Sequence, residues 1–307
     1  METTTLQRSA SVLNDQFSIP ERVNFREGPN GLIMVDLRNE MAVSTVSLHG
    51  AQVLSYIPKD QQDVLWVSRQ SKYEEGKAIR GGIPVCWPWF GGHPTESDLP
   101  SHGFARNVFW EVLATRETPE GATQLSLSLL PSEKSMAIWN EAFRIEIHIT
   151  VGEALDVALH VHNEGDAAWT YTGALHSYFH VSDIRNVSIL GLDGKRYVDQ
   201  LQANKPFVQA GAVKFEAETD RIYLDAPEAC VLHDEGLGRR IIVAKTGSHS
   251  TVVWNPWIEK GERMADFGDL EYREMVCIET ANAASDTVTV QPGASAVLGT
   301  HISLEID

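Results

Sequence analysis

Short segments in which apolar and polar residues alternate recur along almost the whole chain, and they constrain the fold more than any other feature. The clearest are Phe143–Val151 and Leu155–Val161, each apolar at every second position and separated by Gly152-Glu153-Ala154. Successive side chains of a strand point to opposite faces of a sheet. Two alternating runs around a short glycine-containing turn therefore predict a β-hairpin.

The same reading predicts strands in many other places and leaves little room for helices. The best helical candidate is the short segment Glu133–Asn140. Many strands with closely spaced turn signals predict an all-β chain folded as a large antiparallel β-sandwich. No change of composition divides the chain, so we expect one domain, residues 1–307, with about residues 1–25 as a peripheral N-terminal segment. The further predicted strands are Leu32–Leu37, Met41–Leu48, Gln52–Tyr56, Gln124–Leu130, Ala229–Leu232, Ile241–Ala244, Thr251–Trp254, Thr287–Val290 and Ala296–Ile306.

Charge and cysteine content limit the partners and the compartment. The net charge of -17 disfavours nucleic acid and anionic membrane surfaces, although a few converging arginines could still bind a small anion. Cys86, Cys230 and Cys277 lie far apart without metal-type spacing, which is typical of a reduced intracellular protein. The chain shows neither a signal-peptide pattern nor a membrane-length apolar run. We expect a cytoplasmic monomer without membrane contact.

Glu279 is an ionisable residue inside an apolar run that ends at Ala281. Alternation places it on one strand face with Met275, Cys277 and Ala281. A carboxylate there has either a raised pKa or a charged partner, and both are typical of functional sites. The alternative is a strand-end glutamate turned to solvent.

Arg80 opens a segment with paired glycines, Gly81 and Gly82, followed by Trp87, Trp89 and Phe90. Paired glycines permit a sharp turn or a close backbone approach to a ligand. The aromatic rings could stack on a sugar, or they could simply fill the core.

Two further segments concentrate polar groups. His102 and Arg106 lie close together around Gly103, after Ser101. Alternation places His176 on one face with Tyr178 and His180, which could line a groove or face solvent. The eleven histidines form no ligand set with a supporting carboxylate, so the sequence predicts no metal site.

Seven short motifs, taken together and in order, resemble the glucose-6-phosphate 1-epimerase branch of the aldose 1-epimerase (galactose mutarotase-like) family. They span most of the chain, from about Leu32 to the C-terminus. The motifs are Leu48-His-Gly-Ala-Gln-Val, Ile79-Arg-Gly-Gly-Ile-Pro, His102-Gly-Phe-Ala-Arg, Leu175-His-Ser-Tyr-Phe, Thr219-Asp-Arg-Ile-Tyr, Val253-Trp-Asn-Pro-Trp and Val276-Cys-Ile-Glu-Thr-Ala-Asn.

The resemblance implies a galactose mutarotase-like supersandwich with the sugar site on a concave sheet face and no cofactor. It implies that His176 and Glu279 are catalytic. Five other residues are implied to bind substrate, with the two arginines contacting phosphate: Arg80, Ser101, His102, Arg106 and Asp220. Ser101 stands where some members carry a longer glutamine, and His102 is implied to have a supporting role.

The implied reaction interconverts the α and β anomers of a hexose 6-phosphate, chiefly glucose 6-phosphate. A base takes the proton of the C1 hydroxyl, an acid protonates the ring oxygen, and the opened sugar recloses from the other face. We expect Glu279 to be ionised and to raise the pKa of His176, so that His176 stays protonated as an imidazolium near neutral pH. Arginines suit the phosphate because they bind it with planar, bidentate geometry.

Three alternatives remain open from the sequence. An epimerase for unphosphorylated aldoses would not need two arginines, and a non-catalytic sugar-phosphate-binding or regulatory module would not need both His176 and Glu279. A glycoside hydrolase or lyase would need paired carboxylates.

Overall fold

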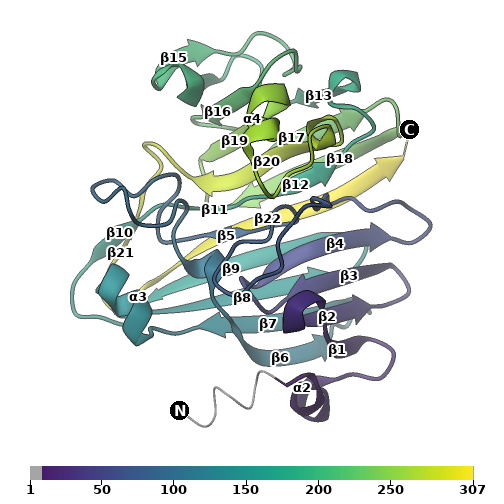
Figure 1. The fold of residues 1–307 in the computed structure, drawn as a ribbon, viewed down its shortest axis with the longest axis vertical. Helices are drawn as coiled ribbons and strands as arrows, with labels where there is room; N and C mark the ends of the chain where they lie inside the picture. Colours follow the sequence, from purple (N-terminus) through teal and green to yellow (C-terminus); the bar gives the residue numbers. More distant parts are fainter. Residues whose placement is uncertain (1–8, 307) are drawn as a thin grey trace.

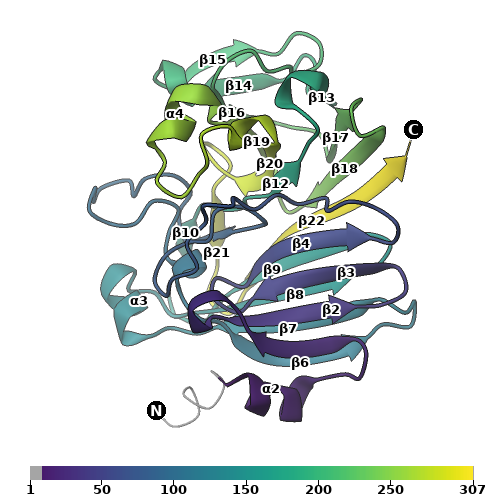
Figure 2. The ribbon, with the colours of Figure 1, turned by 45° about the vertical axis from the view of Figure 1, so that its right-hand side comes forward.

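The computed structural model describes residues 9–306 and shows antiparallel sheets stacked in two layers (Figures 1 and 2). One layer is a single eight-stranded sheet. Its strands, in spatial order, are β6 (Glu111–Glu117), β7 (Thr123–Leu129), β8 (Phe143–Val151), β9 (Leu155–Asn163), β22 (Ser295–Ile306), β18 (Arg239–Thr246), β17 (Ala229–Asp234) and β13 (Val187–Leu190).

The second layer consists of two sheets that lie side by side over the first. The four-stranded sheet contains β1 (Val23–Glu27), β2 (Ile33–Arg38), β3 (Ala42–Ser47) and β4 (Gln52–Pro58). The eight-stranded sheet contains β15 (Lys205–Val208), β14 (Arg196–Asp199), β16 (Thr219–Tyr223), β19 (Ser250–Asn255), β20 (Met275–Asn282), β11 (Gly173–Leu175) and β5 (Val85–Cys86), with β12 (Tyr178–His180) also paired to β20.

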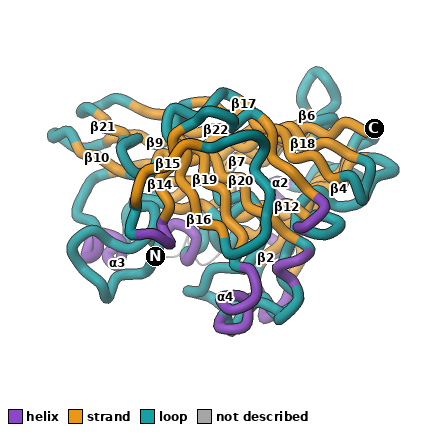
Figure 3. Tube along the Cα trace, turned by 90° about the horizontal axis from the view of Figure 1, so that it is seen from above, coloured by secondary structure: helices purple, strands orange, loops and turns teal. Residues whose placement is uncertain are grey.

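Helices are few and short, and they lie around the stacked strands (Figure 3). They are α2 (Ala10–Phe17), α3 (Glu133–Ile138) and α4 (Trp257–Arg263), with 3-10 turns η1 (Pro29–Gly31), η2 (Ala105–Asn107), η3 (Ile184–Asn186), η4 (Gln200–Gln202) and η5 (Glu271–Arg273). A two-stranded ribbon pairs β10 (Trp169–Tyr171) with β21 (Val288–Val290). No helix within residues 9–306 combines the length and the apolar character that a membrane crossing requires.

The core lies between the two layers and explains the alternation in the sequence. Along β8 and β9 every second side chain is buried, as the hairpin prediction requires. One cluster of buried apolar side chains takes members from both layers and from residues as distant as Leu13 and Ile302. The predicted all-β antiparallel sandwich is confirmed.

The N-terminal segment is not wholly peripheral, contrary to the sequence-based expectation. Leu13 of α2 and Val23 and Phe25 of β1 are buried in the common core. Apolar side chains in both elements give this segment enough buried surface to join the sandwich. Residues 1–8 of the expected peripheral segment lie outside the described residues.

Candidate active site

Glu279 lies in the middle of β20, a strand that is buried at all of its positions. The strand pairs with β19 on one side and with β11 and β12 on the other, so both of its edges are covered. The side chain of Glu279 is 1% exposed. The carboxyl group is therefore buried, and the alternative of a solvent-facing strand-end glutamate is wrong.

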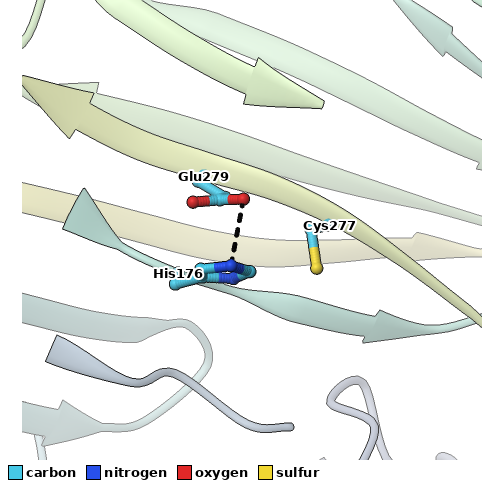
Figure 4. Close-up of side chains that lie close together, drawn as sticks. All are labelled: His176, Cys277 and Glu279. Carbon is cyan, nitrogen blue, oxygen red and sulfur yellow. Dashed lines mark ion pairs between the residues drawn. The ribbon is translucent and has the colours of Figure 1, made fainter. Parts of the chain in front are cut away.

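His176 lies directly across from Glu279, at the point where β11 gives way to β12. Leu175 is paired with Thr280 and Tyr178 with Cys277, and the same register places His176 opposite Glu279. The Nε2 atom of His176 is 3.3 Å from Oε1 of Glu279 (Figure 4). Two ionisable side chains distant in sequence thus meet as neighbours of one sheet.

Several polar atoms at this site are buried without a partner in the structure. They are Oε2 of Glu279, Nδ1 of His176 and Nε of Arg106. Buried polar atoms are normally hydrogen-bonded, because leaving one unpaired costs about 1–3 kcal/mol. A polar ligand could supply the missing partners.

Burial shifts the pKa values of both groups, and for His176 the direction is opposite to the increase expected from the sequence. Desolvation lowers the pKa of His176 well below its usual value, and the nearby His102, Arg106 and Arg80 lower that pKa further. Desolvation and then Asp220 raise the pKa of Glu279 well above its usual value, against an opposing effect of Arg106. The loss of hydration is the largest cause of both shifts. Both shifts favour the neutral forms, a carboxylic acid at Glu279 and a neutral imidazole at His176.

Aromatic rings fix the orientation of His176. Tyr178 stacks on the imidazole with ring centroids 4.7 Å apart and an angle of 11° between planes. Trp254 of β19 meets the imidazole edge-on at 6.1 Å. Both rings are almost completely buried. The imidazole therefore has little rotational freedom.

His102 lies next to the pair, with its ring 5.7 Å from that of His176. Its Nδ1 accepts a hydrogen bond from the backbone N–H of Gly91 at 3.2 Å. Burial, with Arg106, Arg80 and Lys260, lowers the pKa of His102 to about 3. A neutral imidazole that accepts at Nδ1 carries its proton at Nε2. His102 can therefore donate one hydrogen bond to a ligand.

Arg106 belongs to η2 and has most of its guanidinium uncommitted. Its Nη2 donates to the backbone oxygen of Ser101 at 2.7 Å, so Ser101 participates through its carbonyl group. Gly103, between His102 and Arg106, has a φ of +72°, and an added Cβ would lie 1.9 Å from the backbone oxygen of Trp87. Only glycine fits there.

Arg80 is much more constrained than Arg106. Its Nε and Nη2 donate to the two carboxylate oxygens of Asp266 at 3.2 Å each, and its Nη1 donates to Oη of Tyr178 at 3.2 Å. Arg80, one of the two arginines implied to contact phosphate, is thus already part of an ion pair.

Asp220, on β16, is near enough to influence the pKa of Glu279. Its Oδ1 accepts a hydrogen bond from Gln200 at 2.5 Å, and Nζ of Lys260 on α4 is 3.9 Å from its Oδ2. Burial raises the pKa of Asp220. The structure thus brings every predicted site residue into one region of the second layer, on β16, β20, the β11–β12 junction and nearby loops.

Sequence analysis missed Lys260 and Asp266. Neither belongs to one of the seven motifs, and both come from the segment that follows β19. Their relevance comes only from tertiary contacts with Asp220 and Arg80.

The glycines and tryptophans near Arg80 serve packing. A Cβ on Gly81 would lie 2.4 Å from the backbone oxygen of Trp66, and one on Gly82 2.0 Å from that of Val53. These glycines permit close contact between backbone segments. Trp87 and Trp89 are buried in the core, so the core-filling reading holds for both.

His176, Cys277 and Glu279 form a possible metal-ligand group that sequence spacing could not reveal. Their ligand atoms lie within 4.8 Å of one another. Zinc uses such donors, but it needs the sulfur as a thiolate. Burial raises the pKa of Cys277 well above its usual value and outweighs the opposing effect of Arg80, so the thiolate is disfavoured. The donor chemistry favours proton transfer at this site over cation binding.

A hollow of about 280 Å³ is lined by Trp89, Phe90, His93 and Thr172 among others. Phe90 contacts the ring of His102 at 4.9 Å. Neither His176 nor Glu279 lines this hollow. The candidate site is therefore identified by the chemistry of its side chains and not by the size of a hollow.

Comparison with protein families matches residues 34–303 to the model described as aldose 1-epimerase. Two relatives are each provisionally named a glucose-6-phosphate 1-epimerase. The one from Escherichia coli (strain K12) is 38% identical over 254 residues, which is 82% of this chain and 83% of the relative. The one from Cenchrus ciliaris is 37% identical over 275 residues, 86% of this chain and 82% of the relative.

The crystal structure of a protein from Salmonella typhimurium, provisionally named a mutarotase, has the same fold. It superimposes with a TM-score of 0.87 at 32% sequence identity. The match covers 95% of this chain and 96% of the other.

Proposed function

This chain belongs to the aldose 1-epimerase family, and from that premise we propose that it interconverts the α and β anomers of hexose 6-phosphates, chiefly glucose 6-phosphate. The names of its relatives support this substrate class. The observation that carries the proposal is the buried His176–Glu279 pair, whose Nε2 and Oε1 atoms are 3.3 Å apart.

Anomer exchange needs one group that donates a proton and one that accepts a proton. Ring opening delivers a proton to the ring oxygen and removes one from the C1 hydroxyl. Reclosure on the other face of C1 reverses both transfers. A pair that holds a single proton satisfies both steps and returns to its starting state.

The protonation described above makes Glu279 the donor and His176 the acceptor when sugar first binds, the opposite of the sequence-based expectation. Because both groups are buried, water does not compete for the proton. Tyr178 and Trp254 hold the imidazole in place during both transfers.

The predicted substrate-binding residues other than Ser101 contact the sugar phosphate in this proposal: Arg80, His102, Arg106 and Asp220. Arg106 has a buried Nε without a partner and offers further N–H donors to phosphate. His102 can donate to a sugar oxygen, and Asp220 can accept from a hydroxyl. Ser101 acts by holding Arg106 through its carbonyl group.

The direct test is the rate of α–β exchange of glucose 6-phosphate, followed by magnetisation-exchange NMR with the uncatalysed rate subtracted. We expect catalysed exchange that is much slower or absent with free glucose. A protein that binds glucose 6-phosphate without accelerating exchange would be a non-catalytic binding module. Equal rates on both sugars would indicate an epimerase for unphosphorylated aldoses.

The same proposal places the enzyme in the cytoplasm as a monomer that does not bind nucleic acid. The net charge of -17 supports the last point. Cys86, Cys230 and Cys277 are free and buried, which suits a reducing compartment.

A further inference from the structure

The proposed function gives no role to Lys260, although this cation lies beside a predicted substrate-binding residue. Its Nζ is 3.2 Å from Oε1 of Glu218 and 3.9 Å from Oδ2 of Asp220. It also lies 5.8 Å from the centre of the Trp254 ring. The Lys260 side chain is 34% exposed, so a small ligand can reach it. An ammonium group has three N–H donors, and the ion pair with Glu218 leaves donors for a ligand.

The start of α4 fixes the place of Lys260. Trp257, the first residue of this helix, has a φ of +55°, a conformation that a bulky residue adopts only where its surroundings enforce it. Its N–H donates to Oδ1 of Asn255 at 2.9 Å, and its ring packs on Tyr272 with centroids 5.2 Å apart. Nδ2 of the buried Asn255 donates to the backbone oxygens of Tyr272 and Met275 at 2.8 and 2.9 Å. The helix therefore leaves β19 in a set direction and lies beside β16 and β19 (Figures 1 and 2).

Strand register places Asp220 and Trp254 on the same sheet face as the candidate catalytic pair. Asp220 of β16 pairs with Trp254 of β19, and Trp254 pairs with Cys277 of β20. Cys277 shares its strand face with Glu279, and directly paired residues point to the same face. Neighbouring strands are about 4.8 Å apart, so the backbone of Asp220 lies roughly 10 Å across the sheet from β20. A sugar held against the catalytic pair can therefore extend toward Asp220 and Lys260.

The gap between Lys260 and Asp220 has the size for one hydroxyl oxygen. At 3.9 Å, Nζ and Oδ2 are too far apart for a direct hydrogen bond. A hydroxyl oxygen about 2.8 Å from each would accept from the ammonium group and donate to the carboxylate. Oδ1 of Asp220 already accepts from Gln200 at 2.5 Å, whereas within residues 9–306 no hydrogen bond reaches Oδ2. Burial raises the pKa of Asp220 and Lys260 is the main opposing cause, so Lys260 favours the ionised acceptor.

We propose, building on the proposed function, that Lys260 is a substrate-binding residue that holds, together with Asp220, one ring hydroxyl of the sugar other than the hydroxyl at C1. Lys260 donates a hydrogen bond to this hydroxyl, and Asp220 accepts one from it. Glu218 positions Lys260 through the ion pair at 3.2 Å. Only a hydroxyl with the right position and orientation contacts both groups, so the pair contributes to the choice among hexose 6-phosphates. None of these contacts involves the phosphate group.

The test combines Lys260→Met with sugars that each lack one hydroxyl. We measure the dissociation constants of glucose 6-phosphate and of its 2-deoxy, 3-deoxy and 4-deoxy analogues by calorimetry. Lys260→Met should weaken the binding of glucose 6-phosphate at least roughly 10-fold, because it removes a hydrogen bond from a charged group. One analogue should bind the wild type more weakly by a similar factor, and Lys260→Met should change its affinity by less than about twofold. For the other two analogues, Lys260→Met should keep its full effect.

Two further variants provide a match and a control. Asp220→Ala should weaken the binding of glucose 6-phosphate and leave within about twofold the affinity of the same analogue that Lys260→Met leaves unchanged, because both groups contact one hydroxyl. Arg263→Met removes a cation from an exposed position of the same helix, and it should change each dissociation constant by less than about twofold. Thermal melts show whether each variant is folded, and Lys260→Ala replaces Lys260→Met if the latter is not.

The inference is overturned if Lys260→Met weakens the binding of glucose 6-phosphate and of all three analogues by the same factor, since Lys260 would then act through the field or the phosphate. It is also overturned if Lys260→Met behaves like Arg263→Met, or if Lys260→Met and Asp220→Ala single out different analogues. These measurements do not require turnover. A wild type that binds glucose 6-phosphate without accelerating exchange would contradict the proposed function and leave this inference intact, whereas a wild type that binds none of these sugars would contradict both.

Discussion

Glu279 and His176 each lose hydration on folding. The pKa of Glu279 rises and the pKa of His176 falls, so each shift favours the neutral form of the group. Both shifts favour a carboxylic acid beside a neutral imidazole. The apolar strand around Glu279 predicted a perturbed carboxyl group from sequence alone. The direction of the histidine shift could not be predicted, because it depends on burial and on His102, Arg106 and Arg80, which tertiary structure brings close to His176.

Replacing Glu279 by Gln should remove the exchangeable proton but preserve the shape of the side chain. We expect catalysed exchange of glucose 6-phosphate to fall by at least about 100-fold, the lower range for general acid–base catalysis. Magnetisation-exchange NMR on protein with an unchanged circular dichroism spectrum is the measurement. Wild-type turnover in that folded variant would remove Glu279 from the mechanism.

The same variant should be more stable than the wild type near neutral pH. Because the folded-state pKa of Glu279 lies above its usual 4.5, the pH-dependent cost of burying this group is absent below that pH and grows as pH rises toward the folded pKa. Glutamine avoids this cost, so we expect a gain of about 1–3 kcal/mol at pH 7. Melting curves from pH 4.5 to 8 should diverge with rising pH, and parallel curves would contradict the raised pKa.

His176 should stay neutral at pH values where an ordinary histidine is protonated. Its folded-state pKa lies below the usual 6.5, so the stability that it contributes is lost as pH falls below 6.5. Nitrogen-15 NMR of the imidazole, assigned with a His176→Gln variant, should show a neutral ring at pH 6.5. An imidazolium at that pH would restore the sequence-based assignment of the proton to His176.

At the scale of elements, alternation located strands well wherever one face packs on the core. Phe143–Val151 was predicted with the bounds that β8 has, and the helix predicted at Glu133–Asn140 is present as α3, two residues shorter. The strand expected through His176 is interrupted: β11 ends at Leu175 and β12 begins at Tyr178. The N–H of His176 donates to the oxygen of Pro84 and not to β20, a contact that no local pattern encodes.

Gly103→Ala should disrupt the loop that carries His102 and Arg106. The added Cβ would clash with the backbone of Trp87, and the residue has a positive φ, so we expect a loss of more than about 3 kcal/mol. Gly121→Ala is the control, because Gly121 also has a positive φ but no atom within 4 Å of an added Cβ. It should cost only about 1 kcal/mol. Chemical denaturation measures both, and equal losses would show that backbone strain alone limits this loop.

At the scale of the whole molecule, one apolar cluster joins both layers of the sandwich. We therefore predict that the chain unfolds in a single cooperative transition, as one domain. Differential scanning calorimetry should give equal calorimetric and van't Hoff enthalpies. Two resolved transitions would show that the halves of the second layer unfold separately.

The register between β20 and the β11–β12 segment has a consequence for how such a chain can change in length. His176 meets Glu279 because Ala174 faces Ala281 and Tyr178 faces Cys277. Inserting or deleting one residue between these positions would turn every following side chain to the opposite face. Substitutions alter one residue of the site at a time, whereas a single inserted or deleted codon here would separate the two catalytic groups. In this stretch, the number of residues is a stricter requirement than the identity of most of them.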